Sequence, residues 1–384
     1  MPWSKVRADT DEPDFLRDSR GEGRRISHAE AIRESFDQAL TLDPATYLMG
    51  QGVNDPGGMF GTCSGLVDEH GADRVFDTPL AENGMTGIAI GSAIVGMRPI
   101  YLHNRPDFLF LALDQIANHA AKWSFMTGGA VSVPLVLWAC IGRGWGSAAQ
   151  HSQALQGTFM HLPGLKLVMP STGHDAKGLL HAALKDPNPV LILEHRFNFK
   201  LKGIVPEAPY TIPIGKGILR RQGRDLTIVT ISQMVHEAHA AADRLAGEGI
   251  EVEIVDLRSL RPLDESLVLE SLARTGRLVI ADHGWKTCGI TAEIGALAAE
   301  KGYHSLRAPI ERVCAPDMPT PAGYTLEQAF YQGQSEIVAA ARRVVSSGQS
   351  IDLSTADAFT AARGDEEHKR AMSAPAREPA RSTR

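Results

Sequence analysis

Two series of apolar runs, separated by segments with helical periodicity, constrain most strongly what this chain can fold into. The runs include TYLMG at 46–50, RPIYLH at 98–103, VPLVLWAC at 133–140, DLTIVTI at 225–231 and RLVIADH at 277–283. They show little alternation of apolar and polar residues, so we expect strands covered on both faces, as in a parallel sheet. Helical patterns between strands favour right-handed strand–helix–strand units. We therefore predict an α/β fold with two doubly wound domains.

The expected domain boundaries follow changes in composition along the 384 residues, a length that suits two domains. Residues 1–26 are charged with few apolar side chains and predict a flexible N-terminal extension. The first domain is expected at 27–200, a Pro-rich linker at 201–222 and the second domain at 223–345. The tail at 346–384 is rich in Ser, Ala and Arg and is expected to be disordered.

Composition and charge argue against several classes of protein. The net charge is −6 and no dense basic cluster occurs, which disfavours nucleic-acid binding. No uninterrupted apolar run approaches the roughly 18 residues of a membrane span, and the N-terminus lacks the apolar core of a signal peptide. The 4 cysteines form no CxxC pair, so no zinc or redox motif is predicted and a cytoplasmic location is expected.

The usual nucleotide-binding and hydrolase motifs are absent from the sequence. GxGxxG, GxxxxGK[ST] and GxSxG do not occur. The Gly-rich stretch GRGWGSA at 142–148 follows an apolar run but has no Walker lysine, so a plain flexible loop is the simpler interpretation. We therefore expect no complete phosphate-binding cradle in this chain.

One isolated acid stands out in FDTPLAENGMTGIAIGSAIVGMRP at 76–99. Glu82 lies where a short apolar run ends and a helix of small residues begins. An acid at this place could simply stabilise the positive end of the helix dipole. A carboxyl group in mostly apolar surroundings also suits proton sharing with a bound group. From these residues alone both interpretations stay open.

Several longer segments carry a family resemblance. They are DTPLAENGMTGIAIGSAIVGMRPI, LDQIANHAAK, AAQHSQALQGTFMHLPGLKLVMP, VEIVDLRSLRPLD and DMPTPAGYTLEQAF. From about residue 26 to residue 342, the chain resembles the beta subunit of the thiamine diphosphate-dependent first component of 2-oxo acid dehydrogenase complexes. The pyruvate, branched-chain and acetoin enzymes belong to this family. The resemblance implies a pyrimidine-binding domain followed by a transketolase C-terminal-like domain.

The resemblance also implies an active site divided between two subunits. In the family, an alpha subunit binds the cofactor's diphosphate and Mg²⁺ through a GDG…NN motif, while the beta subunit binds the aminopyrimidine ring. This chain has no GDG followed by paired Asn. We therefore expect an alpha partner and an α2β2 heterotetramer, with a lipoyl acyltransferase core as a further partner.

Three residues match the family's cofactor and substrate site. Glu82 is expected to hydrogen-bond N1′ of the aminopyrimidine, which favours the tautomer that removes the thiazolium C2 proton. Phe108 is expected to stack on the aminopyrimidine, although DFLFLAL offers two aromatic candidates and a core phenylalanine is the alternative. His151 in AAQHSQ is expected to orient the 2-oxo acid or to assist acyl transfer, because imidazole titrates near neutral pH.

Two further assignments rest on the resemblance. Small residues in the helix after Glu82 are expected at the subunit interface, with intrachain packing as the alternative; these are Gly87, Gly91, Ala93 and Gly96. Backbone oxygens near the KDPNP turn match a potassium site of many family members, and oxygen ligands suit a hard cation. The matching positions are Leu135, Ala183, Leu184, Asp186 and Asn188.

The sequence departs from the family pattern near the expected site. Gln51 replaces a usual Glu and cannot ionise, which puts proton communication between two active sites in doubt. Arg105 and Asp107 add charge near the expected substrate mouth, and Arg143 adds more. A guanidinium suits a carboxylate or phosphate, so a substrate with an extra anionic or hydroxylated group is one hypothesis. A surface salt bridge is the other interpretation of these charges.

The leading functional prediction is a dehydrogenase beta subunit that is active only with its alpha partner. It would take part in decarboxylating a 2-oxo acid and transferring the acyl group to a lipoylated carrier. One alternative is a split transketolase-like enzyme that transfers a ketol or acyl unit to an aldehyde. Another is a non-catalytic assembly paralogue, against which Glu82 and His151 argue. Fold alone does not decide among these functions.

Overall fold

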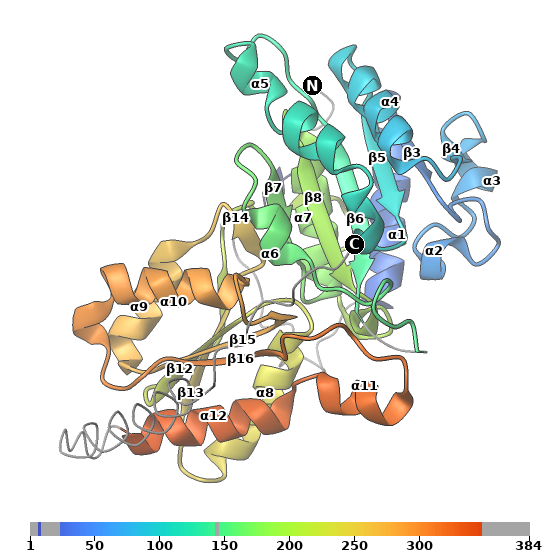
Figure 1. The fold of residues 1–384 in the computed structure, drawn as a ribbon. Helices are drawn as coiled ribbons and strands as arrows, with labels where there is room; N and C mark the ends of the chain where they lie inside the picture. Colours follow the sequence, from blue (N-terminus) through green and yellow to red (C-terminus); the bar gives the residue numbers. More distant parts are fainter. Residues whose placement is uncertain (1–6, 9–23, 143–145, 348–384) are drawn as a thin grey trace, which may run out of the picture. The chain divides into compact units, whose positions relative to one another are not determined.

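The computed structural model describes residues 7–8, 24–142 and 146–347 (Figure 1). The larger sheet has seven strands in the order β14-β7-β8-β6-β5-β3-β4, and the other has five in the order β11-β13-β12-β15-β16. In these sheets β14 and β11 are antiparallel to their neighbours, and the remaining pairs in the described ranges are parallel. The predicted α/β class with two doubly wound domains is therefore confirmed.

The strands coincide closely with the apolar runs of the sequence. The larger sheet contains β3 (Thr46–Gly50), β4 (Val75–Asp77), β5 (Arg98–His103), β6 (Val136–Ile141), β7 (Lys166–Val168), β8 (Val190–His195) and β14 (Ser259–Arg261). The smaller sheet contains β11 (Ile218–Arg221), β12 (Leu226–Thr230), β13 (Val252–Asp256), β15 (Leu278–Trp285) and β16 (Glu311–Ala315). Every residue of β3, β6, β8, β12 and β13 is buried, which explains why these runs lack alternation.

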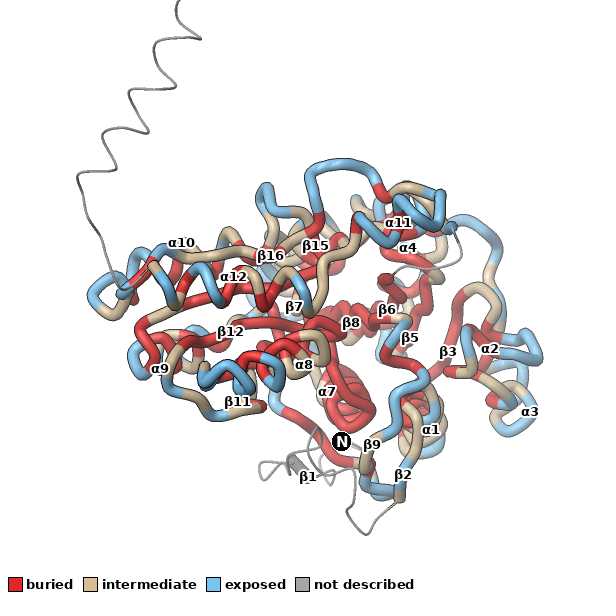
Figure 2. Tube along the Cα trace, turned by 90° about the horizontal axis from the view of Figure 1, so that it is seen from below, coloured by how far each residue is buried: buried red, intermediate tan, exposed pale blue. Residues whose placement is uncertain are grey.

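Helices cover both faces of the larger sheet. On one face lie α1 (His28–Leu42) and α7 (Gly173–Lys185), whose N-termini both carry capping boxes. On the other face lie α4 (Glu82–Ile94), the π-helical segment η3 (Gln115–Ala120) and α6 (Gln156–Met160). Figure 2 shows β6, β8 and α7 as a buried interior, in contrast to the exposed segments around α2 (Gly58–Gly61) and α3 (Leu66–His70).

The smaller sheet is also covered on both faces. One face packs against α8 (Met234–Ala246) and α12 (Gln334–Ser347). The opposite face packs against α9 (Glu265–Thr275) and α10 (Ile290–Lys301), and this cluster is continuous with the α4 side of the larger sheet. The two domains therefore share one hydrophobic core cluster. The remaining helices are α5 (Trp123–Met126), α11 (Tyr324–Phe330) and the 3-10 turns η2 (Pro106–Phe110), η4 (Arg196–Asn198) and η5 (Tyr303–Ser305).

Buried charges join the segments that carry the two sheets. Arg220 on β11 lies 2.5 Å from a carboxylate oxygen of Asp175 at the start of α7 and 3.0 Å from Asp256 at the end of β13. Arg258 adds a contact of 3.5 Å to Asp175. Burial raises the pKa of Asp256 to about 6. Burial opposes ionisation of Asp175 as well, but Arg220 and Arg258 outweigh it and hold the pKa of that carboxyl well below its usual range.

The sequence at 107–126 has helical periodicity, but the structure divides this segment into η2, η3 and α5. The break between η3 and α5 coincides with a tertiary contact. The turn containing Gly164 packs against Ala121 so closely that a Cβ at Gly164 would lie 1.8 Å from the Ala121 carbonyl oxygen. Lys122 also donates a hydrogen bond to the Pro163 carbonyl. Sequence periodicity does not report such a contact.

Strands occur in the connector and near the N-terminus. The predicted linker contains β9 (Lys202–Ile204), β10 (Tyr210–Thr211) and the sheet strand β11. Within the predicted extension, β1 (Arg7–Ala8) pairs with β10, and β2 (Arg25–Ser27) pairs with β9.

The buried side chain of Lys177 binds the backbone of the connector. The Lys177 ammonium pairs with Glu34 and donates hydrogen bonds of 2.7 Å to the carbonyls of Pro206 and Glu207.

β14 lies in the second expected domain but completes the larger sheet, where Ser259 pairs with Val168. Of the expected tail at 346–384, residues 346–347 belong to α12 and residues 348–384 lie outside the described residues. No helix of the described ranges is long and apolar enough to span a membrane.

We predict that Arg220→Met lowers the free energy of unfolding by about 3–5 kcal/mol, because it leaves buried carboxylates without their shared cation. Urea denaturation of the full chain measures this change. Arg221→Met is the matched control, since the neighbouring Arg221 pairs with the exposed Asp243, and its loss should be at most about 1 kcal/mol. Equal losses for the two variants would contradict a special role for the buried network.

Candidate functional site

The predicted site residues lie at the carboxyl ends of adjacent parallel strands in the larger sheet. Gln51 follows β3, Glu82 follows β4, and Phe108 follows β5. His151 lies in the segment after β6. Carboxyl ends of parallel strands meet at one edge, which is where open α/β sheets bind ligands. The sheet order therefore brings together residues that are far apart in the sequence.

Glu82 is the first residue of α4 and is largely buried, at 8% exposure. Its position at the helix N-terminus favours a negative charge there. Among the described residues, one hydrogen-bond donor reaches its carboxylate: Nε2 of Gln51 lies 3.5 Å from Oε1, at the limit of a hydrogen bond. A carboxylate has about four acceptor positions, so this group retains capacity for a further donor.

Phe108 and His151 are in direct contact. Their ring centroids lie 5.1 Å apart with an interplanar angle of 77°, an edge-to-face arrangement. Phe108 is half-buried, whereas the His151 ring is exposed. The second aromatic of DFLFLAL, Phe110, lies instead near Phe159, with ring centroids 6.3 Å apart. Of the two candidates, Phe108 is thus the one that accompanies His151.

Arg105 and Asp107 are buried rather than placed at an exposed mouth, with 6% and 8% exposure. Arg105 donates a hydrogen bond of 3.1 Å to the Gly142 carbonyl. Asp107 accepts hydrogen bonds from the backbone N–H of Gln153 at 3.3 Å and from its side-chain amide at 2.8 Å. Burial raises the pKa of Asp107. The surface salt-bridge interpretation is therefore wrong, while a role toward substrate stays a prediction. Arg143 lies outside the described residues.

A contact that sequence analysis missed connects the segment carrying His151 to the smaller sheet. Nε2 of Gln156, the first residue of α6, lies 2.8 and 2.9 Å from the two carboxylate oxygens of Asp282 on β15. Asp282 is 3% exposed, and burial raises its pKa to about 6. The available signal was an acid near the end of the apolar run RLVIADH, but its partner was not predictable from spacing.

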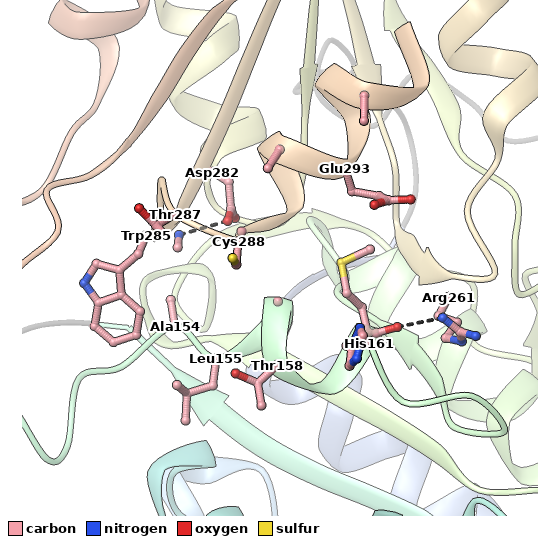
Figure 3. A pocket seen from close by; sticks show the side chains of 16 residues that line it. Ala154, Leu155, Thr158, His161, Arg261, Asp282, Trp285, Thr287, Cys288 and Glu293 are labelled. Atoms are coloured by element: carbon pink, nitrogen blue, oxygen red, sulfur yellow. Dashed lines mark hydrogen bonds between the residues drawn. The ribbon is translucent and has the colours of Figure 1, made fainter. Parts of the chain in front are cut away.

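A cavity of about 850 Å³ lies beside this contact, between α6 and the start of α10. Figure 3 shows Asp282, Cys288 and Glu293 on one side and Leu155, Thr158 and His161 on the other. Six small residues line this cavity. They are Ala154, Gly157, Gly284, Gly289, Ala292 and Ala296.

The small residues predicted at a helix interface divide between two sides of α4. Gly91 and Gly96 are exposed, whereas Ala93 is buried and a Cβ at Gly87 would approach Gln115 to 3.4 Å. An exposed stripe along one face of α4 is formed by Gly84, Ile88, Gly91 and Val95, which have the spacing of one helix face. Ile88 is 58% exposed and Val95 81% exposed.

The residues predicted to hold potassium gather at the opposite, amino-terminal edge of the sheet. The Leu135 carbonyl accepts from Val190 N–H at 3.0 Å, and the Leu184 carbonyl accepts from the Arg98 guanidinium at 2.8 Å. One Asp186 oxygen pairs with Lys166, and the other accepts from Asn188 N–H at 3.0 Å. The Ala183 carbonyl accepts from Asp186 N–H at 3.1 Å. Oxygen ligands are present, but protein cations already contact two of them.

Comparison with known proteins identifies both domains. Residues 24–202 match the family described as transketolase, pyrimidine binding domain, and residues 215–337 match transketolase, C-terminal domain. The beta subunit of acetoin:2,6-dichlorophenolindophenol oxidoreductase from Cupriavidus necator is 45% identical over 336 residues, covering 85% of this chain and 99% of the relative. The pyruvate dehydrogenase E1 component subunit beta-2 of Oryza sativa subsp. japonica is 39% identical, covering 83% of this chain and 86% of the relative.

The chain belongs to the beta-subunit family of thiamine diphosphate-dependent 2-oxo acid dehydrogenases. The resemblance predicted from the sequence motifs is thereby confirmed. A further member of this beta-subunit family, the 2-oxoisovalerate dehydrogenase subunit beta of Bacillus subtilis, is 39% identical and covers 83% of this chain and 98% of the relative.

A solved structure supports the fold of this chain. A split gene transketolase described as an inactive beta4 tetramer matches with a TM-score of 0.68 and 22% identity, covering 84% of this chain and 99% of that chain. At this identity the match supports the fold alone. The roles of Glu82, Phe108 and His151 stay predictions.

We predict that Asp282→Asn changes how stability depends on pH. Asp282 has a folded-state pKa of about 6, above the value of about 3.9 in an unfolded chain. Between these values the folded state holds a proton that the unfolded state has released, so this group's contribution to stability falls as pH rises. Relative to wild type, the variant should gain up to about 3 kcal/mol between pH 4 and pH 7.

Urea denaturation at several pH values measures this difference. Asp256, which shifts in the same direction, is present in both proteins and cancels in the comparison. The matched control is Gln150→Asn at an exposed position, which removes no titratable group, so the difference from wild type should not vary with pH. A constant difference for Asp282→Asn as well would refute the assigned titration.

Proposed function

We propose that this chain is the beta subunit of a heteromeric thiamine diphosphate-dependent 2-oxo acid dehydrogenase. Its complex would decarboxylate a 2-oxo acid and transfer the acyl group to a lipoylated carrier. The observation that supports this most strongly is the arrangement of Glu82, Phe108 and His151 at one edge of the larger sheet, with Phe108 and His151 in contact. The relatives named as dehydrogenase subunits support the same function.

The surroundings of Glu82 fit an aminopyrimidine ring. Its largely buried carboxylate receives one long contact from Gln51 and retains acceptor positions for a ring nitrogen. When bound, thiamine diphosphate supplies the carbon nucleophile that attacks the 2-oxo group. Glu82 would hold the proton shared with the pyrimidine N1′, and Phe108 would pack against the ring face.

His151 is suited to a role toward the substrate. Its ring is exposed in the single chain, while its edge-to-face contact with Phe108 sets it beside the proposed pyrimidine position. We propose that the imidazole orients the 2-oxo acid or exchanges a proton during acyl transfer. Either role requires the ring to keep its place relative to Phe108.

A partner surface is supported by exposed apolar side chains on and near α4. Ile88 and Val95 are accompanied by Leu80 at 80%, Phe125 at 87% and Leu111 at 60% exposure. A Cβ at Gly84 or Gly91 would meet nothing within 4 Å, so a partner could approach the α4 backbone closely. Such a patch is unusual for a free monomer. We propose that an alpha subunit carrying the GDG…NN motif and Mg²⁺ covers it in an α2β2 assembly.

The family pattern supplies two further elements of the proposal. A lipoyl acyltransferase core would receive the acyl group, and a potassium ion near Asp186 would brace the end of α7. The domain boundaries at 27–200 and 223–345 are kept as approximate limits of the two functional modules. The transketolase-like alternative has no specific observation in its favour. A requirement for a lipoylated acceptor would separate it from the dehydrogenase.

We predict that Glu82→Gln lowers kcat of the assembled complex by at least about 100-fold while leaving partner binding intact, because the amide cannot accept the proton. The assay is the thiamine diphosphate-dependent reduction of an artificial electron acceptor by pyruvate and branched 2-oxo acids. Glu300→Gln, at an exposed position, is the matched control and should retain wild-type turnover. Wild-type turnover in Glu82→Gln would remove the proposed role of this carboxyl.

We predict that Ile88→Arg abolishes capture of the alpha partner, because it places a charge in the apolar stripe of α4. Tagged full-length chain is purified from its own cells, and stable partners are identified by mass spectrometry. Tyr303→Arg, at an exposed apolar position of the second domain, should retain a stoichiometric GDG…NN partner. Retention of that partner by Ile88→Arg would place the interface elsewhere.

A further inference from the structure

The described residues between β6 and α6, 142 and 146–155, include His151, and this segment is held by side chains from two separate parts of the chain. Two residues after His151, Gln153 bonds to Asp107 through its backbone N–H at 3.3 Å and its side-chain amide at 2.8 Å. Five residues after His151, the side-chain amide of Gln156 bonds to Asp282 at 2.8 and 2.9 Å. Both supports lie on the C-terminal side of the histidine.

The first support belongs to a single turn that contacts the segment repeatedly. Arg105 binds the Gly142 carbonyl at the start of the segment, and Asp107 binds Gln153 near its end. Phe108, the next residue, contacts the His151 ring. Arg105 and Asp107 thus form hydrogen bonds within the chain. The turn that carries them contacts both the segment and the His151 ring.

The second support comes from the smaller sheet and is closely enclosed. Gln156 is fully buried and Asp282 is 3% exposed. Asp282 also accepts a hydrogen bond of 2.9 Å from Gly284 N–H. A Cβ at Gly284 would lie 2.6 Å from the Asp282 carboxylate and 3.1 Å from the Gln156 amide. Glycine at this position is therefore needed for the pair to form.

Contacts beside the pair fix the start of α6 against the second domain. A Cβ at Gly157 would lie 3.2 Å from the Cys288 carbonyl oxygen, so the two backbones pass close together. Further along α6, the Met160 carbonyl accepts a hydrogen bond of 2.8 Å from Arg261. The first turn of α6 therefore cannot shift without disturbing buried polar contacts, which are costly to leave unpaired.

We propose that Asp107 and Asp282 are positioning residues for His151, acting through Gln153 and Gln156. The first fixes the histidine segment to the turn that carries Phe108. The second makes the position of the imidazole depend on the second domain, which contributes none of the residues proposed to touch cofactor or substrate. This inference rests on the proposed function of His151.

The first test measures the segment itself and does not depend on catalysis. In hydrogen–deuterium exchange of the full chain, Gln153→Leu and Gln156→Leu should each increase exchange in peptides covering 146–156 several-fold, with little change elsewhere. Gln150→Leu is the matched control, because Gln150 is exposed and lies in the same segment. Unchanged exchange in both test variants would overturn the proposal.

The second test asks whether the supports act through His151. In the assembled complex, Gln156→Leu should lower kcat by about 10- to 100-fold while leaving the half-saturating thiamine diphosphate concentration unchanged. In a His151→Ala background the same substitution should have no further effect on kcat. An equal loss in both backgrounds would overturn the proposal, since the effect would then not pass through the imidazole.

A second variant and the His151→Ala result separate failure of this inference from failure of the proposed function. If Gln156→Leu does not fold because Asp282 is left buried and unpaired, Gln153→Leu at its half-buried position is put through the same kcat comparison. If His151→Ala alone leaves kcat unchanged, the proposed function of His151 fails. The exchange measurement then still decides whether the two supports hold the segment.

Discussion

The buried contacts among Arg220, Asp175 and Asp256 are the interaction on which the arrangement of this structure most depends. Asp175 caps the helix after β7, whereas Asp256 ends a strand of the smaller sheet. A shared guanidinium compensates two carboxylates that could not both remain ionised alone in a dry interior. The shared core cluster and the β14–β7 pairing reinforce the same junction. The Gln156–Asp282 contact joins the segments that carry the two sheets at a second place.

The candidate site residues lie in different kinds of local structure. Glu82 is the first residue of α4. Phe108 lies in a short 3-10 turn, next to charged residues that form hydrogen bonds within the chain. His151 has no regular secondary structure around it and keeps its place through contacts with its neighbours. This division agrees with the proposed roles, in which the Glu82 carboxyl keeps one position and the exposed His151 imidazole meets the substrate. Packed helices and strands are well suited to the first task and a supported loop to the second.

Much of this architecture could be predicted from sequence because its determinants are local. Apolar runs such as VPLVLWAC are buried on both sides and lie close to the observed strands. Glu82, Phe108 and His151 were predicted as site residues from the motifs around them, and their roles stay predictions. The broken helix near Ala121, the strands of the connector and β14 were not predictable in the same way. Each depends on a partner far away in the sequence, such as Gly164, Lys177 or Val168. The burial of Arg105 and Asp107 was missed for the same reason, since charged residues ordinarily indicate surface.

The pairing of β14 with β7 has a consequence for how this family can be divided. A fragment that stops before residue 259 would lack the strand that covers the outer edge of β7, and unpaired edges readily recruit other chains. Separate expression of the first module therefore carries an aggregation hazard. Chimeras joined within 201–222 would also place β14 from one parent against β7 from another. Natural exchange of modules among relatives should then favour crossover points that keep these two strands from the same ancestor.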